Sequence, residues 1–229
     1  MTRDSFAKII DHSILKPNAK TEDILQGCTL ARKERLGLVM VQPHYVAFTN
    51  KQLIGSNILV GTVLSFPHGC DIPKVKAYSA SALCDAGADE IDMVINIGAV
   101  IDNNFGLVKE DIAGVVAAAP GKLIKVILET CYLTRQQIAD AAKACVDAGA
   151  HFVKTSTGFA EKGANVDDVL LMRQVVGPNI GVKAAGGIRS LDQARDMLKA
   201  GASRLGISAS LSILKEWDER VGAKAELPI

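Results

Sequence analysis

The chain has 229 residues, of which 48% are hydrophobic and only 4% aromatic. This length fits one large domain or two small ones, and the apolar fraction is enough for a core of Val, Ile, Leu and Ala. With 26 basic and 25 acidic residues, the chain has no strong net field that would attract nucleic acid or an acidic membrane.

The cysteines and the N-terminus predict a reducing, aqueous environment. Five cysteines is an odd number, and no pair has CxxC spacing, which argues against a disulfide framework or a zinc site. The N-terminal residues lack the apolar core of a signal peptide, and no apolar run reaches the ~18 residues of a membrane span. We therefore expect a cytoplasmic protein with free thiols.

Strand-like and helix-like segments alternate along the chain. Eight short runs rich in β-branched or long apolar residues predict strands over residues 8–12, 37–41, 58–65, 90–96, 123–129, 151–155, 180–184 and 204–207. Amphipathic segments between them predict helices over residues 21–35, 73–86, 134–148 and 190–200. Ser190 is expected to cap the last of these helices.

A repeated Ala-Gly-Ala sequence marks three helix ends, at Gly87, Gly149 and Gly201. Glycine suits the left-handed conformation that follows a helix C-terminus. Strict alternation of strand and helix implies a parallel sheet, either closed into a barrel or open and doubly wound. The count of eight, the length and the absence of a GxGxxG turn after the first strand favour a single-domain (β/α)8 TIM barrel over residues 1–229.

Three lysines lie inside otherwise apolar predicted strands: Lys125, Lys154 and Lys183. One such lysine alone is better explained as a snorkelling surface residue, but three on nearby strands favour the barrel lumen. If Lys154 and Lys183 share the lumen, desolvation and like-charge repulsion lower the amine pKa. Because a neutral amine attacks carbonyl groups and forms an imine, one of these lysines is a candidate nucleophile.

The segment Asp89-Glu90-Ile91-Asp92 supplies a candidate acid–base group. Asp89 and Glu90 are expected at the start of the strand, as solvated surface charges. Asp92 lies within the apolar run, where its carboxylate would keep the second lysine charged and relay protons. The alternative is that Asp92 pairs with a lysine for structural reasons only.

The loops after the seventh and eighth strands are where such barrels commonly bind phosphate. Gly186 and Gly187 follow the seventh predicted strand, and Gly206 and Ser208 lie at the eighth. Glycine lets backbone N–H groups approach phosphate oxygens closely. No two of the four histidines have helical i, i+4 spacing, so the sequence gives no support for a metal site.

From about residue 8 to residue 215, these segments resemble the deoxyribose-phosphate aldolases, in the same order. The motifs are IDHSILKP at residues 10–17, FPHG at 66–69, GADEIDMV at 87–94, KVILET at 125–130, FVKTSTGF at 152–159 and VKAAGGIR at 182–189. The resemblance implies a class I aldolase that needs no metal or organic cofactor. It would reversibly cleave 2-deoxy-D-ribose 5-phosphate to D-glyceraldehyde 3-phosphate and acetaldehyde.

The resemblance also assigns site residues by position. Lys154 would form the imine, with Asp92 and Lys183 as the proton relay and Asp11 in contact with the substrate hydroxyls. The phosphate side would consist of Gly158, Gly186, Gly187, Gly206 and Ser208, and the expected substrate-binding set also includes Lys125 and Thr157. The expected partners are small aldehydes and sugar phosphates. The sequence does not fix the oligomeric state, and a homodimer is one assembly compatible with it.

Several positions depart from the family pattern. Met40 stands where many members have cysteine, and Ala209 stands where a second serine is frequent, which removes one hydroxyl donor. Ser210 is a candidate replacement for that donor. The loop at 159–163 is poorer in glycine and carries Glu161, and no tyrosine follows Trp217.

Two alternatives stay open at this point. An isomerase would rely on a Glu/His pair, and a metal-dependent aldolase would rely on a histidine cluster; neither pattern is visible. A non-catalytic phosphosugar-binding protein on the same scaffold would be expected to lose Lys154 and Lys183, yet the chain has both.

Overall fold

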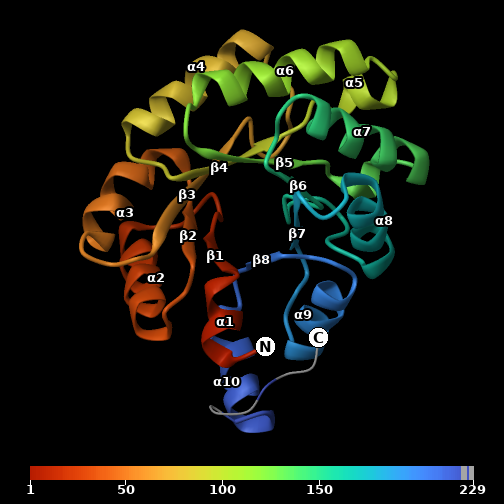
Figure 1. Ribbon diagram of the computed structural model, residues 1–229. Helices are drawn as coiled ribbons and strands as arrows, with labels where there is room; N and C mark the ends of the chain where they lie inside the picture. Colours follow the sequence, from red (N-terminus) through yellow and green to blue (C-terminus); the bar gives the residue numbers. More distant parts are fainter. Residues whose placement is uncertain (223–225, 227–229) are drawn as a thin grey trace.

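The computed structural model describes residues 1–222 and 226, and its strands form a closed parallel barrel in chain order. The strands are β1 Ile10–Ile14, β2 Leu38–Val41, β3 Leu59–Leu64, β4 Glu90–Val94, β5 Leu123–Ile127, β6 Phe152–Lys154, β7 Gly181–Ala185 and β8 Arg204–Ile207. They surround a common centre, with the helices outside (Figure 1). The predicted eight-stranded barrel is therefore confirmed.

The outer layer of the described residues consists mainly of α-helices. They are α1 Arg3–Lys8, α2 Thr21–Glu34, α3 Val46–Leu53, α4 Pro73–Asp85, α5 Ile97–Ile101, α6 Phe105–Ala118, α7 Arg135–Asp147, α8 Val166–Val176, α9 Leu191–Lys199 and α10 Ser210–Arg220. Short 3-10 helices follow β2 and β5, at Pro43–Tyr45 and Thr130–Tyr132. The four helices predicted by range correspond to α2, α4, α7 and α9.

Local sequence signals explain most of these boundaries. The Ser190 side chain accepts a hydrogen bond from the backbone N–H of Gln193 and caps α9 as predicted. Gly87, Gly149 and Gly201 have φ angles of 100°, 84° and 105°, the left-handed conformation expected after α4, α7 and α9.

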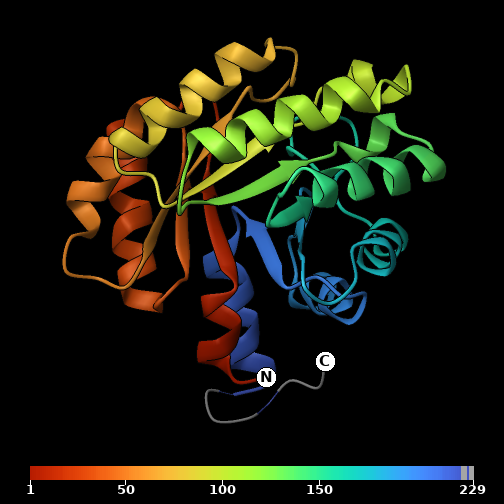
Figure 2. The same ribbon diagram turned by 45° about the horizontal axis from the view of Figure 1, so that its top comes forward.

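The first strand begins later than predicted. The apolar run predicts a start at residue 8, but residues 3–8 form α1, whose N-terminus is capped by the Thr2 side chain. This short helix then packs on the last one: Phe6 stacks on Trp217 of α10 with ring centroids 5.0 Å apart. Figures 1 and 2 both show α1 and α10 side by side.

The inward-facing side chains of the barrel differ from one side of the lumen to the other. On the β2–β3 side, Leu38, Met40 and Val63 form a small buried apolar cluster, against which Leu15 and Phe66 pack. The inward positions of β1 and of β4 to β8 are largely charged, as described below. The outward-facing strand residues join the helices in one large apolar core.

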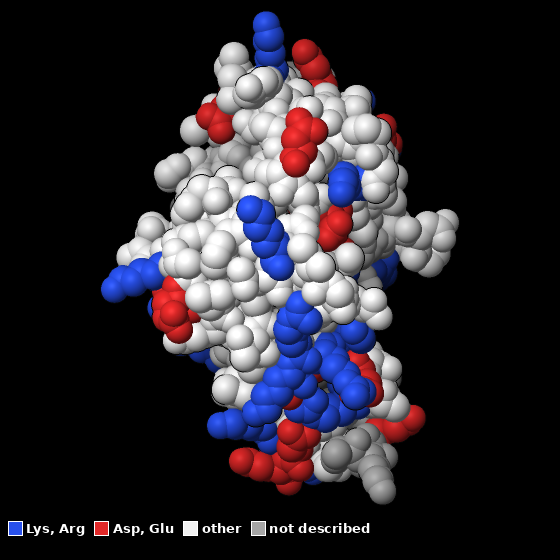
Figure 3. Space-filling model, turned by 90° about the vertical axis from the view of Figure 1, so that its left-hand side faces the viewer, with Lys and Arg blue, Asp and Glu red and all other residues white. Residues whose placement is uncertain are grey.

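The surface carries charges of both signs. On one side of the molecule, acidic and basic side chains are scattered over the upper part, and a denser group of Lys and Arg, bordered by acidic side chains, covers the lower part (Figure 3). Among the residues described, no helix combines the length and apolar character needed to cross a membrane.

Candidate active site

Seven charged side chains meet inside the barrel. Because side chains alternate along a strand, Glu90 and Asp92 of β4 point the same way, into the lumen. The register places Asp92 beside Lys125, and Lys183 between Lys154 and Arg204. Together with Asp11 of β1, the cluster has three carboxylates and four basic groups. The charged cluster consists of Asp11, Glu90, Asp92, Lys125, Lys154, Lys183 and Arg204.

Asp92 is the centre of this cluster. Its Oδ2 accepts hydrogen bonds from Nζ of Lys154 at 2.8 Å and from Nζ of Lys183 at 2.7 Å. Its Oδ1 accepts from Nζ of Lys125 at 2.7 Å. Lys154 and Lys183 therefore both lie in the lumen, and they share one carboxylate oxygen.

The other two carboxylates hold the remaining positive charges. Asp11 Oδ2 lies 2.5 Å from Nζ of Lys183, and Asp11 Oδ1 accepts from Nε of Arg204 at 2.9 Å. Glu90 Oε2 lies 2.5 Å from Nζ of Lys125 and 3.2 Å from Nη2 of Arg204. Of the four basic groups, Lys154 has only the shared Asp92 as a partner within the described residues.

This imbalance determines where a proton is easily lost. Burial, opposed by Asp92 and reinforced by Lys183, lowers the pKa of Lys154 to about 8. Burial alone would raise the pKa of Asp92, but the ammonium groups of Lys125, Lys154 and Lys183 hold it well below its usual range. The site thus combines a permanent carboxylate with an amine that is partly neutral near pH 7.

Glu90 corrects one sequence-based expectation. It was expected to be a solvated charge, but it is 3% exposed and belongs to the buried cluster. Arg204, which the sequence analysis did not single out, pairs with it from the first position of β8. Side chains two positions apart on a strand point to the same side. Glu90 lies two residues before Asp92, and Arg204 two residues before Gly206, so this spacing could have identified both as inward-facing.

Asp11 and Lys125 were expected to contact substrate. Both are fully buried, and each is engaged in several ion pairs. Lys125 also lies two residues before Ile127, the register partner of Lys154, so it sits one inward-facing position further from the carboxyl ends of the strands. In this geometry, Asp11 holds the ammonium group of Lys183 in place, and Lys125 holds the carboxylate of Asp92. A direct substrate contact by Asp11 or Lys125 stays a prediction.

Glu129 was missed as a site residue. It follows β5 in the left-handed conformation, with φ 54°, and its carboxylate accepts hydrogen bonds from the backbone N–H and the hydroxyl of Thr157. Burial raises its pKa. Because both donors of Thr157 are taken, this geometry gives Thr157 the role of fixing the loop after Lys154, and the expected substrate contact by Thr157 stays a prediction.

The expected phosphate side has three left-handed glycines. Gly186 and Gly187 have φ angles of 87° and 79°, and Gly158, with φ 86°, lies against Gly186. Ser208 is exposed, and α10 begins two residues later without a side-chain cap. Gly206 faces the lumen, where an added Cβ would lie 3.1 Å from Cε of Lys183.

Ser210 does not replace the hydroxyl that is missing at Ala209. Its side chain is fully buried, and its hydroxyl is bonded to the Ile207 carbonyl and to His12, away from the exposed loop. Glu161 is exposed. The expectation about the tail concerns residues after Trp217, and of these, 223–225 and 227–229 lie outside the described residues.

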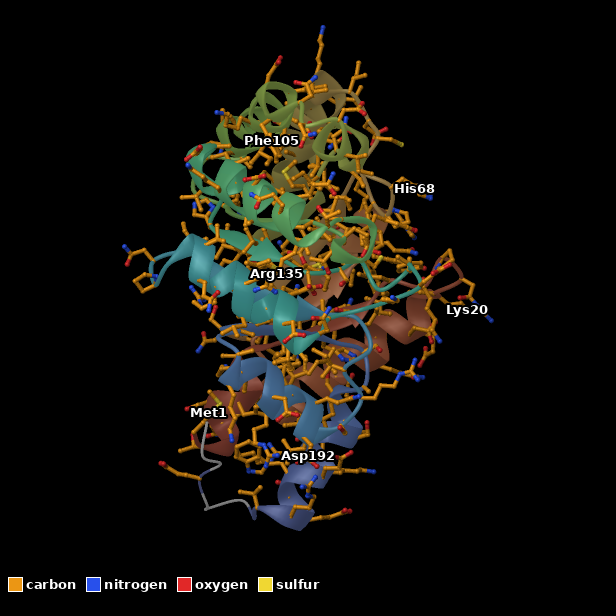
Figure 4. All side chains as sticks on the ribbon, turned by 90° about the vertical axis from the view of Figure 1, so that its right-hand side faces the viewer. Met1, Lys20, His68, Phe105, Arg135 and Asp192 are labelled. Carbon is orange, nitrogen blue, oxygen red and sulfur yellow. The ribbon has the colours of Figure 1, made fainter. Side chains whose placement is uncertain are left out.

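Two phenyl rings meet at the mouth of the barrel. Phe66 follows β3 and packs on the apolar lumen cluster, and Phe159, from the loop after β6, meets it edge to face at 5.3 Å. Cavities of about 360 and 530 Å³ lie on either side of Phe159, and His68 lines the smaller one. His68 and Lys20, from the β3–α4 and β1–α2 loops, project on the same side of the molecule (Figure 4).

Comparisons with known proteins show the family to which the chain belongs. Residues 6–216 match the model of the DeoC/LacD family aldolases. The chain belongs to the DeoC/LacD aldolase family. It is 49% identical over 208 residues to a deoxyribose-phosphate aldolase of Streptococcus gordonii, covering 91% of this chain and 94% of the relative. It is 46% identical over 211 residues to one of Bacillus cytotoxicus, covering 92% and 95%.

A solved structure of the family has the same fold. The deoxyribose phosphate aldolase of Aeropyrum pernix superimposes with a TM-score of 0.88 at 29% identity, covering 95% of this chain and 92% of that one. That protein is described as a tetramer, and the homodimer expected here stays a prediction. The chain is thus an aldolase, a carbon–carbon lyase, and the lumen cluster is its candidate active site.

Proposed function

We propose that the enzyme reversibly cleaves 2-deoxy-D-ribose 5-phosphate to D-glyceraldehyde 3-phosphate and acetaldehyde through an imine on Lys154. The observation that carries this proposal is the Asp92 oxygen shared by Lys154 and Lys183, all three of which are buried in the lumen. The names of the relatives support the choice of substrate.

The reaction begins with the neutral amine of Lys154. Its lone pair attacks C1 of the open-chain sugar, and loss of water gives a protonated imine. Removal of the proton from the C3 hydroxyl then breaks the C2–C3 bond. The bonding pair moves into the imine as an enamine, and C3 leaves as the aldehyde carbon of D-glyceraldehyde 3-phosphate. Protonation at C2 and addition of water release acetaldehyde and restore Lys154.

Asp92 and Lys183 supply the proton transfers. Since the pKa of Asp92 is held well below its usual range, Asp92 is a carboxylate in the resting enzyme and is protonated only transiently during the reaction. Lys183 lies between Asp92 and Asp11, at 2.7 and 2.5 Å, which fixes its ammonium next to the amine of Lys154. In this arrangement Lys183 donates a proton when water leaves and when C2 is protonated.

The phosphate would bind at the loops after β7 and β8. The consecutive left-handed Gly186 and Gly187, the exposed Ser208 and the uncapped start of α10 present N–H and hydroxyl donors on that side. No lysine or arginine is needed there for a backbone cradle. The expected metal-free chemistry stays a prediction; in residues 1–222 and 226, no group of three His, Cys, Asp or Glu residues could hold a metal ion.

Reductive trapping tests the nucleophile. The enzyme is incubated with acetaldehyde and borohydride, digested and examined by mass spectrometry, and an ethyl adduct is expected on Lys154. Lys76 serves as an internal control, because it is equally buried but lies in the helix layer, 2.5 Å from Asp111. An adduct on Lys76, or on surface lysines only, would sink the mechanism.

The substrate is tested separately. Purified enzyme is given 2-deoxy-D-ribose 5-phosphate, and release of D-glyceraldehyde 3-phosphate is followed with a coupled dehydrogenase. If Lys154 is trapped but no D-glyceraldehyde 3-phosphate is released, the imine chemistry stands and the assigned substrate is wrong. If phosphosugar binds tightly with neither trapping nor turnover, the non-catalytic alternative is correct.

A further inference from the structure

Helix α10 begins differently from the three α-helices that precede it in the chain. The N-terminal N–H groups of α7, α8 and α9 are capped by the side chains of Thr134, Asn165 and Ser190. The residue before α10 is Ala209, which has no side chain that can cap. The first intrahelical bond of α10 runs from the Ile213 N–H to the Ala209 carbonyl. The N–H groups before Ile213 are therefore available to a ligand.

The first residue of α10 is held from below instead. Ser210 is fully buried, and its hydroxyl donates to the carbonyl of Ile207, the last residue of β8, at 3.2 Å. The same oxygen lies 3.0 Å from Nδ1 of His12 on β1. His12 thus connects β1 to the joint between β8 and α10.

The hydrogen bond has one consistent polarity. Burial lowers the pKa of His12 to about 4, so the imidazole is neutral at pH 7. The single hydroxyl proton of Ser210 is used toward Ile207, so the oxygen accepts and His12 donates from Nδ1. A neutral Nδ1–H tautomer therefore fixes the first turn of α10.

His12 and its neighbour Asp11 point to opposite sides of the barrel wall. Asp11 points into the lumen and pairs with Lys183, while His12, the next residue, points out to the helix layer. The register sets Asp11 beside Gly206 and His12 beside Ile207. The same two-residue step of β1 therefore supports the lysine cluster on one side and the start of α10 on the other.

We propose that His12 is a positioning residue for phosphate recognition. Through Ser210 it sets the orientation of the first turn of α10, whose N–H groups bind the phosphate of the substrate. This inference rests on the proposed function, because it takes the phosphosugar as the ligand. His12 does not touch the substrate, and the imine chemistry does not depend on it.

The test compares phosphorylated and unphosphorylated substrates. His12→Leu and Ser210→Ala are expected to raise KM for 2-deoxyribose 5-phosphate about 5- to 10-fold with kcat unchanged, the size of one lost buried hydrogen bond. For 2-deoxyribose without phosphate, kcat/KM is expected to stay the same. The double variant should be no worse than either single variant, because both remove one interaction.

Two further variants keep the test specific. Thr62→Val is a matched control, because the hydroxyl of Thr62 makes a similarly buried bond, at 3.0 Å to the Val41 carbonyl, on β3. It should leave the ratio of the two substrates unchanged. His12→Asn retains an N–H donor at a similar position and should have the KM of the unaltered enzyme. If His12→Leu does not fold, the comparison of His12→Asn with Ser210→Ala still tests the proposal.

Three results would overturn the inference. The first is an equal loss on both substrates, which means a structural role only. The second is an unchanged KM for the phosphosugar in both single variants. The third is an unaltered enzyme with no preference for the phosphorylated sugar. This result also contradicts the phosphate part of the proposed function, whereas the first two results leave the proposed function intact.

Discussion

The two sides of the barrel lumen follow opposite rules. On the β2–β3 side, Leu38, Met40 and Val63 fill the space with apolar atoms that need no partners. On the other side, seven charged groups pair with one another through ion pairs and hydrogen bonds. The contrast teaches that the lumen is a packed core on one side and a reactive ionic network on the other, within the same ring of strands.

The largest expected effect comes from the amine itself. Lys154→Met should reduce cleavage of the phosphosugar to the background of the assay, because no other amine in the cluster is without a second carboxylate partner. The assay is the coupled release of D-glyceraldehyde 3-phosphate, with circular dichroism as the control for folding. Substantial activity in this variant would place the nucleophile elsewhere.

Asp92→Asn should have the next largest effect. It removes the proton relay, which lowers kcat by about 10²- to 10⁴-fold. Because the Asp92 carboxylate raises the pKa of Lys154, removal of this carboxylate should also shift the pH at which kcat/KM rises to a lower value. A loss of kcat with the limb unmoved would mean that the amine does not sense Asp92.

The charged side of the lumen is also expected to lower the free energy of unfolding. The folded-state pKa of Lys154 is about 8 and the ordinary value is 10.5, so burial of the charged amine destabilises the protein at all pH values below 8. Removing the charge in Lys154→Met should therefore stabilise the enzyme at pH 7, by an amount on the order of 3 kcal/mol. The gain should shrink as pH rises from 8 toward 10.5. Denaturant unfolding at two pH values measures it, and a gain independent of pH would contradict the linkage.

The pH dependence of the unaltered enzyme gives a smaller effect. Below pH 8 the neutral fraction of Lys154 falls about tenfold per pH unit, so kcat/KM should rise with pH and level off near 8. A profile that levels off near 10, the range of an ordinary lysine, would show that the ionic network does not perturb the amine.

The smallest effect is expected on the apolar side. Met40→Leu conserves volume and apolar character, so the free energy of unfolding should change by less than about 1.5 kcal/mol. The pH profile should not move, because no charge is nearby on β2 or β3 to be disturbed. A shift of the profile in this variant would mean that the two sides of the lumen are not independent.

Much of the fold was predictable because the physical signals are local. The strands were found from apolar runs, and the helix ends from Gly87, Gly149 and Gly201. The first strand was placed too early because six residues of α1 carry no strong periodic pattern, and their stability comes from Phe6 against Trp217, far along the chain. Tertiary packing decided that boundary, and local propensity did not.

The site was predictable in its centre and less so at its edges. Lys154, Lys183 and Asp92 stand out as charges inside apolar strands. Glu90 was misplaced because it is the first residue of its strand, where a charge normally reaches solvent. The roles of Glu129 and Thr157 depend on a contact between two loops, and sequence patterns hold no information on which loops meet.

The double duty of β1 has a consequence for how this chain can change over generations. An insertion or deletion inside β1 would exchange the sides of Asp11 and His12, sending the carboxylate among apolar helices and the imidazole into the ionic network. Changes in α1 are limited by packing instead, because Phe6 is fully buried and stacks on Trp217. Asp11 and His12 must therefore be inherited as a unit, and Phe6 with Trp217 as a second one.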